Sequence, residues 1–376
     1  MTRKNQSLTP DQRDIQRRDP SPLLFRPIRF REVEVPNRIM LSPMCQYSAH
    51  DGVPNDWHLM HLGARAAGGV GLVCTEATHV VPEGRITPHC LGLWNDEQQA
   101  AFARIVRLVE SQGAVPAIQI GHAGRKASAA PPWAGRRPLG ADEGGWEPVA
   151  PSPIPYQEGG PVPREMTADA VRASIEATAA AARRARDAGF RVLEIHGAHG
   201  YLIHSFLSPL SNTRDDGYGG GFDNRVRFLM ETVEAVRGEW PAELPLFLRI
   251  SCTDWVEGGW DLEQSVELAR RLAATGLIDL IDCSSGGNDP RQRIPRHPGY
   301  QVPFAETVRR ESGLATGAVG LISRADMAEE ILANGRADLA VLGRAILADP
   351  HWPINAAKAL RVPPPWPRQY ERSDVF

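Results

Sequence analysis

Cysteine is scarce in this sequence, and the few cysteines follow no ligand pattern. There are five, Cys45, Cys74, Cys90, Cys252 and Cys283, an odd number without a C-x-x-C pair. That spacing provides neither a disulfide framework nor the paired thiolates of a zinc ribbon or a cysteine-ligated cluster. We therefore expect a protein of the reducing cytoplasm.

The sequence also lacks an excess of charge and a long apolar run. Lys and Arg number 42 against 45 Asp and Glu, a formal net charge of −3, which creates no field for a phosphate backbone or an anionic membrane. No stretch approaches the roughly 18 uncharged apolar residues of a membrane span, and residues 1–22 contain no apolar segment of a secretory signal. Nucleic acid and membrane partners are therefore not expected.

What is present is a regular alternation of strand and helix patterns from residue 23 onward. We expect strands at 39–42, 71–76, 115–120, 191–196, 246–250, 278–283, 315–319 and 338–342. Helical patterns follow them at 58–67, 96–112, 168–188, 224–237, 262–275, 304–310, 325–334 and 354–360. Eight strand–helix units indicate an α/β protein with a single (β/α)8 barrel, or TIM barrel.

Two long loops and two termini complete the predicted organisation. The loops, 121–165 and 197–222, follow the third and fourth strands, on the face of a (β/α)8 barrel that carries active sites. Residues 1–22 are polar and proline-rich, which predicts a flexible N-terminal extension. Residues 23–376 are expected to form one barrel domain with a C-terminal tail.

The end of the fourth strand carries the densest group of reactive side chains. His196, His199 and Tyr201 follow one another closely across a glycine-rich turn. Two imidazoles can donate hydrogen bonds to one developing oxyanion, and a phenol beside them can supply a proton. A pair of buried structural histidines, or a zinc or iron site, would give the same pattern.

Polar groups at other strand ends point to the same face. Cys45 and Tyr47 follow the first strand, Gln119 ends the third, and Arg249 lies near the end of the fifth. An arginine among amide and imidazole donors suits an electron-rich ring that gains negative charge. After the seventh and eighth strands, Gly320, Gly343 and Arg344 predict a phosphate site, which is where this barrel commonly binds phosphate.

Five segments resemble one enzyme family. Residues 36–49, 118–126, 194–220, 224–228 and 334–353 are similar, in the correct order, to the old yellow enzyme family of FMN-dependent ene-reductases. Cys45 with Tyr47, and the ending 369–372, resemble its thermophilic-like subgroup. The resemblance implies a TIM barrel that binds FMN, takes hydride from NADPH or NADH, and reduces the activated C=C bond of α,β-unsaturated carbonyl or nitro compounds.

The resemblance also implies roles for individual residues. His196 and His199 would bind the substrate oxygen, Tyr201 would donate the proton, and Tyr47 would contact the substrate. Flavin N5 would deliver the hydride. The implied flavin contacts are Ser42, Pro43, Met44, Cys45, Ala77, Gln119 and Arg249, with Gly320, Gly343 and Arg344 at the phosphate. In the subgroup a terminal arginine, here Arg372, enters the neighbouring subunit's site, so a homodimer or homotetramer is expected.

Three alternatives remain at this point. A metal-dependent TIM-barrel hydrolase could use His196 and His199 as ligands. A multidomain relative of the 2,4-dienoyl-CoA reductase type would need a later cysteine cluster, and no cysteine follows Cys283. A non-catalytic flavin-binding barrel would hold a flavin that NADPH does not reduce.

Overall fold

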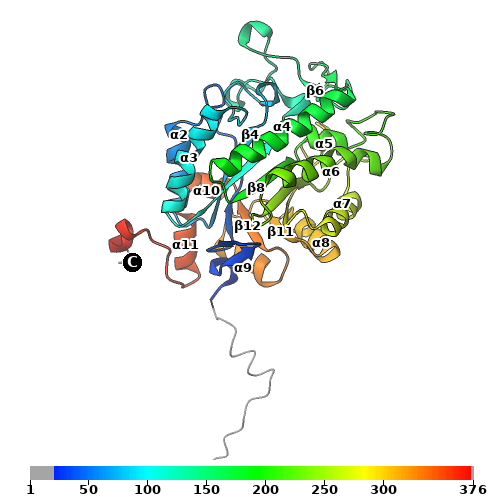
Figure 1. Ribbon diagram of the computed structural model, residues 1–376. Helices are drawn as coiled ribbons and strands as arrows, with labels where there is room; N and C mark the ends of the chain where they lie inside the picture. The colour runs from blue at the N-terminus through cyan, green and yellow to red at the C-terminus, as the bar shows by residue number, and fades with distance from the viewer. Residues whose placement is uncertain (1–20, 374–376) are drawn as a thin grey trace, which may run out of the picture.

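Eight parallel strands close into a barrel in the computed structural model, which describes residues 21–373 (Figure 1). In order around the barrel they are β3 (Ile39–Leu41), β4 (Leu72–His79), β5 (Val115–Gly121), β8 (Val192–Gly197), β9 (Leu246–Ser251), β10 (Leu280–Ser284), β11 (Ala315–Ala318) and β12 (Leu339–Leu342). β12 pairs with β3 and closes the ring. The prediction of a single (β/α)8 barrel is confirmed, with each expected strand within a few residues of its position. The extension predicted at 1–22 falls almost entirely outside the described residues.

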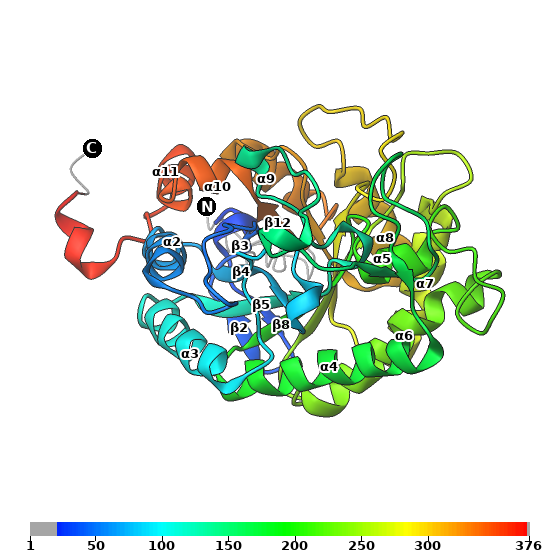
Figure 2. The ribbon, with the colours of Figure 1, turned by 90° about the horizontal axis from the view of Figure 1, so that it is seen from above.

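Helices surround the barrel, as the view from above shows (Figure 2). They are α2 (Asp56–Ala67), α3 (Asp96–Ser111), α4 (Ala168–Asp187), α6 (Phe222–Glu239), α7 (Leu262–Thr275), α8 (Val302–Ser312), α9 (Ala325–Ala333) and α11 (Trp352–Ala359). Two short helices, α5 (Leu202–Leu207) and α10 (Arg344–Ala348), were not anticipated from the sequence. Between residues 21 and 373, no helix is both long enough and apolar enough to cross a bilayer.

A short hairpin closes the amino-terminal end of the barrel. Strands β1 (Ile28–Phe30) and β2 (Val33–Val35) pair antiparallel and place Phe30, Val33 and Val35 in a buried apolar cluster. Phe30 meets Phe247 of β9 edge to face, with ring centroids 5.1 Å apart. Because this end is filled with apolar side chains, the polar residues of the strands gather at the opposite end.

The loop that follows β5 is folded onto the barrel mouth. It contains the two-stranded β6 (Val149–Ala150) and β7 (Arg164–Glu165) and three short 3-10 turns. The indole N–H of Trp146 donates to the carbonyl oxygen of Glu83 at 2.7 Å, and its backbone N–H donates to Ser128 Oγ at the same distance. These bonds fasten the loop above the carboxyl ends of the strands.

The C-terminal segment stands apart from the barrel. After α11 the chain runs outward to the short helix η6 (Arg368–Ser373), which projects from the body in both views (Figures 1 and 2). Lys358 lies over the Trp366 ring at 5.1 Å, and Tyr370 remains exposed.

Candidate active site

Alternation along the strands sends polar side chains into the upper barrel. His196 of β8 lies in register with Arg249 of β9, which in turn lies in register with Asp282 of β10. Two residues earlier on the same face, Phe247 and Leu280 belong to the apolar cluster at the bottom. Since side chains two apart on a strand share a face, the barrel interior changes from apolar to polar within one layer.

His196, His199 and Tyr201 come together as the sequence predicted. Their ring centroids are separated by 5.2 Å between the imidazoles, 5.0 Å from His196 to Tyr201 and 6.5 Å from His199 to Tyr201. Burial, with the Arg249 guanidinium nearby, lowers the pKa of both imidazoles well below the usual value, so both are neutral at pH 7.

Hydrogen bonds orient the two imidazoles. The Ala198 N–H donates to His196 Nδ1 at 3.3 Å, so the ring proton of His196 belongs on Nε2. His199 Nε2 lies 2.8 Å from Ser284 Oγ at the end of β10. If the Ser284 hydroxyl donates this bond, Nδ1 of His199 carries the proton. Each neutral imidazole then has one N–H for a bound oxygen.

Tyr201 shares its surroundings with Lys126, a residue that the sequence did not single out. The Lys126 ammonium lies 5.2 Å from the Tyr201 ring and 4.5 Å from the Tyr156 ring. It donates to the carbonyl oxygens of His199 and Gly287, both at 2.8 Å. Burial raises the pKa of the Tyr201 phenol well above its usual value, so the phenol keeps its proton at neutral pH.

The segment after β3 brings a thiol and a phenol to the same place. Cys45 and Tyr47 pack with Tyr201 against one small apolar cluster. Burial raises the pKa of the Cys45 thiol well above its usual value, so it remains a thiol. The segment is held by Glu76, which accepts from the Gln46 N–H at 2.9 Å.

A buried charge layer lies beneath this cluster. Arg249 Nε is 3.1 Å from Asp282 Oδ2, and its Nη1 donates to Ser42 Oγ at 3.2 Å. Gln119 Nε2 donates to Glu194 Oε1 at 2.7 Å, while Glu194 Oε2 has no hydrogen-bond partner within the described chain. Burial and the nearby Asp282 charge raise the pKa of Glu194 to about 8. Ala77 of β4 lies in register with Gln119.

A cavity of about 390 Å³ leads from this charge layer to the loops after β11 and β12. Arg249 and Ser284 line it at the barrel, and Gly320, Gly343 and Arg344 line it at the loops. The cavity thus brings together the three residues of the predicted phosphate site, whose role remains a prediction. A Cβ added at Gly343 would lie 3.6 Å from Met44 Sδ, so Met44 also borders this region. The sequence missed Ser284 here, although its place at a strand end was a usable signal.

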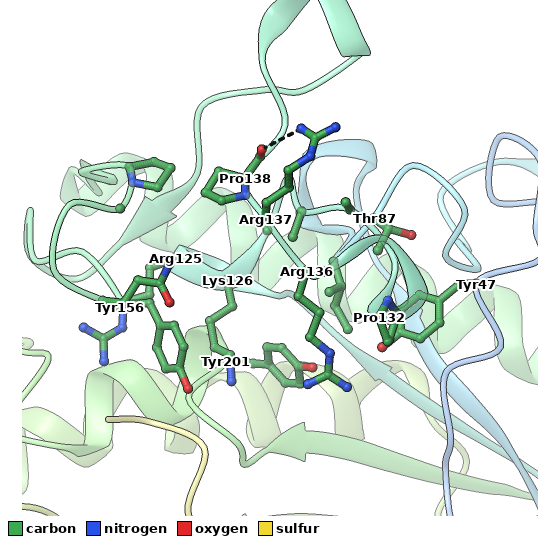
Figure 3. Close-up of a pocket in the computed structure, with 18 residues that line it drawn as sticks. Tyr47, Thr87, Arg125, Lys126, Pro132, Arg136, Arg137, Pro138, Tyr156 and Tyr201 are labelled. Atoms are coloured by element: carbon green, nitrogen blue, oxygen red, sulfur yellow. Dashed lines mark hydrogen bonds between the residues drawn. The ribbon is translucent and has the colours of Figure 1, made fainter. Parts of the chain in front are cut away.

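A second pocket, of about 500 Å³, opens at Tyr201 under the loop that follows β5, and His196 and His199 are not among the residues that line it. Tyr47 and Tyr201 lie in its wall, and Lys126 and Arg136 reach it from the loop (Figure 3). Arg136 gave no signal in the sequence, because it lies in an irregular loop.

Arg372 is not part of this site within one chain. It lies on η6, in the projecting tail, and is absent from the residues that line either cavity. Its predicted entry into a neighbouring subunit remains a prediction.

The two histidines lack the partners of a metal centre. Among residues 21–373, no group of three or more His, Cys, Asp or Glu side chains is arranged to hold a metal ion. His199 instead bonds Ser284, and His196 accepts from Ala198. The metal-dependent hydrolase is therefore not supported.

Comparison with known proteins gives one consistent result. The sequence profile of the NADH:flavin oxidoreductase / NADH oxidase family matches residues 23–362. The chain is 48% identical to an NADPH dehydrogenase of Geobacillus thermodenitrificans, over 94% of this chain and 99% of that protein. It is 46% identical to an NADPH dehydrogenase of Bacillus subtilis, over 93% and 98% of the two chains.

A solved structure of morphinone reductase is similar throughout. It matches with a TM-score of 0.76 and 28% identity, covering 92% of this chain and 91% of that one. Another structure of morphinone reductase is described as a complex with tetrahydroNAD.

Proposed function

This chain belongs to the NADH:flavin oxidoreductase / NADH oxidase family, the old yellow enzymes, and on that basis we propose that it is an ene-reductase. It is an FMN-dependent oxidoreductase that takes its electrons from NAD(P)H. The substrates proposed are α,β-unsaturated carbonyl and nitro compounds. The observation that carries the proposal is the meeting of two neutral imidazoles and a protonated phenol at the barrel mouth.

The residues around the 390 Å³ cavity fit FMN. Gly320 has φ +131°, a backbone conformation that residues with a Cβ rarely adopt, and Gly343 leaves space beside Met44. Arg344 at one end makes no side-chain hydrogen bond within residues 21–373, and Arg249 at the other carries a buried guanidinium. Two permanent cations at opposite ends suit a phosphate and a ring that becomes anionic when reduced.

We assign the flavin contacts accordingly. Ser42, Pro43, Met44, Cys45, Ala77, Gln119 and Arg249 would hold the ring, and Gly320, Gly343 and Arg344 would hold the phosphate. Bound there, FMN would supply the hydride chemistry, with NAD(P)H as the source of the hydride and the alkene as its acceptor. Reduction therefore requires the chain to bind the alkene beside the ring and to supply the second hydrogen as a proton.

The chain's own groups polarise and protonate the substrate. The N–H groups of His196 and His199 donate hydrogen bonds to the carbonyl or nitro oxygen, and these bonds strengthen as negative charge develops there. The Tyr201 phenol, protonated because of its burial, gives its proton to the α-carbon. Tyr47 lies in the same pocket wall and contacts the substrate.

We also make proposals for the oligomeric state and for the cellular location. We propose that Arg372, on the projecting η6, completes the site of a second subunit in a homodimer or homotetramer. We also propose a cytoplasmic location, which the five free cysteines support.

The function is tested by the two half-reactions. Purified protein should be yellow, release FMN on heating, and bleach with NADPH under anaerobic conditions. 2-Cyclohexenone should then restore the oxidised spectrum. Replacing both His196 and His199 by Ala should leave the bleaching intact and slow the recovery by about 100-fold or more, the scale of losing oxyanion donors. Recovery at the normal rate would refute the assignment.

A further inference from the structure

All charged residues that line the 500 Å³ pocket at Tyr201 are positive. Four cationic residues line it, Arg125, Lys126, Arg136 and Arg137, and no Asp or Glu does so in the described chain. Arg125 Nη2 donates to the backbone and side-chain oxygens of Asn288 at 2.6 and 3.0 Å, while its buried Nε has no partner among the described residues.

Arg136 and Arg137 are adjacent in the sequence, but of the two only Arg137 pairs with a carboxylate of the described residues. Arg137 is bound by both carboxylate oxygens of Glu143, and its guanidinium points away from the pocket (Figure 3). Arg136 is exposed; its guanidinium points toward the Tyr201 phenol (Figure 3) and makes no hydrogen bond or ion pair with any residue between 21 and 373. One permanent cation is thus aimed into the pocket without a partner.

The backbone at Arg136 is left-handed, and backbone hydrogen bonds of the surrounding turn support it. Its φ is +55°, a left-handed conformation that costs energy for a residue with a Cβ. The Arg136 N–H donates to the Pro131 carbonyl at 3.3 Å, and the Ala130 N–H donates to the Arg137 carbonyl at 2.8 Å. Strain retained at the rim of a pocket is typical of a binding residue.

Lys126, at the inner end of the pocket, is repelled by the other cationic residues. Burial, with Arg125 and Arg136 nearby, lowers its pKa to about 7, although the rings of Tyr156 and Tyr201 face it. An anion between Lys126 and Arg136 would relieve this repulsion and pair with both cations.

We propose that this pocket recognises an anionic group, a carboxylate or a phosphate, on the molecule that enters it, with Arg136 as the principal contact and Lys126 as the second. The inference rests on the proposed function, since the group would be carried by a reactant that reaches Tyr201. The anion has two possible sources: an acidic alkene, or the 2′-phosphate of NADPH.

The test compares matched ligands on the FMN-loaded enzyme. Calorimetry on the oxidised enzyme measures dissociation constants for 3-oxo-1-cyclohexene-1-carboxylate and 2-cyclohexenone, which share a ring and differ in charge. Stopped-flow reduction gives the dissociation constants of NADPH and NADH. Each is measured for the wild type, for Arg136→Gln, and for Arg137→Gln as a control that removes an adjacent charge.

If the anion belongs to an acidic alkene, Arg136→Gln should weaken binding of the carboxylate ligand by about tenfold or more, the scale of one charge-assisted hydrogen bond. Binding of 2-cyclohexenone should be unchanged. If the anion is the 2′-phosphate, Arg136→Gln should weaken binding of NADPH to the same extent and leave binding of NADH unchanged. The proposal would be overturned if Arg136→Gln changed the dissociation constants equally for the two alkenes and equally for NADPH and NADH. It would also be overturned if Arg137→Gln had the same effect as Arg136→Gln. Selective binding without reduction of either alkene would instead refute the ene-reductase assignment alone.

Discussion

Replacing Glu194 by Gln tests whether the barrel holds a proton beneath the active site at neutral pH. The carboxyl is fully buried, one of its oxygens accepts from Gln119, and the other has no partner within the described residues. Burial raises the pKa of both Glu194 and Asp282, and the Arg249 guanidinium, 3.1 Å from Asp282, opposes this rise at Asp282. Asp282 is therefore the carboxyl of the pair that ionises, and its charge favours the protonated form of Glu194. A glutamine keeps the acceptor for Gln119 and cannot ionise.

The sign and size of the effect follow from linkage. The folded pKa of Glu194, about 8, lies above the ordinary value of 4.5, so between these values the folded state binds the proton and the unfolded state does not. Stability from this group is therefore fully present below pH 4.5 and falls as pH rises toward 8. The loss is about 1.4 kcal/mol per pH unit, or about 2.7 kcal/mol from pH 5.5 to 7.5.

The measurement is the difference in unfolding free energy between the variant and the wild type. Urea unfolding at saturating FMN, followed by tryptophan fluorescence, to which the buried Trp240 and Trp260 contribute, gives this difference at each pH. The unfolding free energy of Glu194→Gln minus that of the wild type should rise from pH 5.5 to 7.5. The control Glu234→Gln, at an exposed site, should show no such trend. A flat difference for Glu194→Gln would mean that the carboxyl is ionised throughout, and the reasoning would be wrong.

Four further predictions concern the site and the tail. Cys45→Ala should shift the flavin reduction potential and change the rates of the two half-reactions in opposite senses; loss of all activity without a shift in potential would point to covalent catalysis. Ser284→Ala removes the hydroxyl beside His199, and should raise the KM for 2-cyclohexenone several-fold while the rate of reduction by NADPH is retained; an unchanged KM would show that the bond does not orient the ring. Affinity for the carboxylated alkene should fall as pH rises from 6 to 8, because Lys126 loses its charge, and calorimetry of Lys126→Met should show no such fall. Deleting residues 369–376 should raise the substrate KM with FMN still bound; unaltered kinetics, or a monomeric wild type in light scattering, would contradict an intersubunit role for Arg372.

Local patterns were sufficient for the barrel but not for its short helices. The eight strands were predictable because most are compact runs of apolar residues that alternate along the chain with amphipathic helical patterns. α5 and α10 were missed for a physical reason. Every residue of α5 is buried, so no apolar–polar periodicity marks it, and α10 has only five residues. Tertiary contacts, not local preference, stabilise such short segments.

The sequence by itself determined which side chains reach the mouth of the barrel, because the carboxyl end of a parallel strand delivers its last residues to one face. His196, His199, Tyr201, Cys45 and Arg249 could be placed there on that ground.

Only the tertiary structure decided the electrostatic state of that face. The raised pKa of Glu194 depends on Asp282, which lies two strands away in the barrel. The lowered pKa of Lys126 depends on burial beneath a loop and on the approach of Arg136. Arg136 lies in an irregular turn with a left-handed backbone, and its guanidinium is directed toward Tyr201 (Figure 3). Burial and distances between charges arise only when distant segments meet, and no local pattern records them.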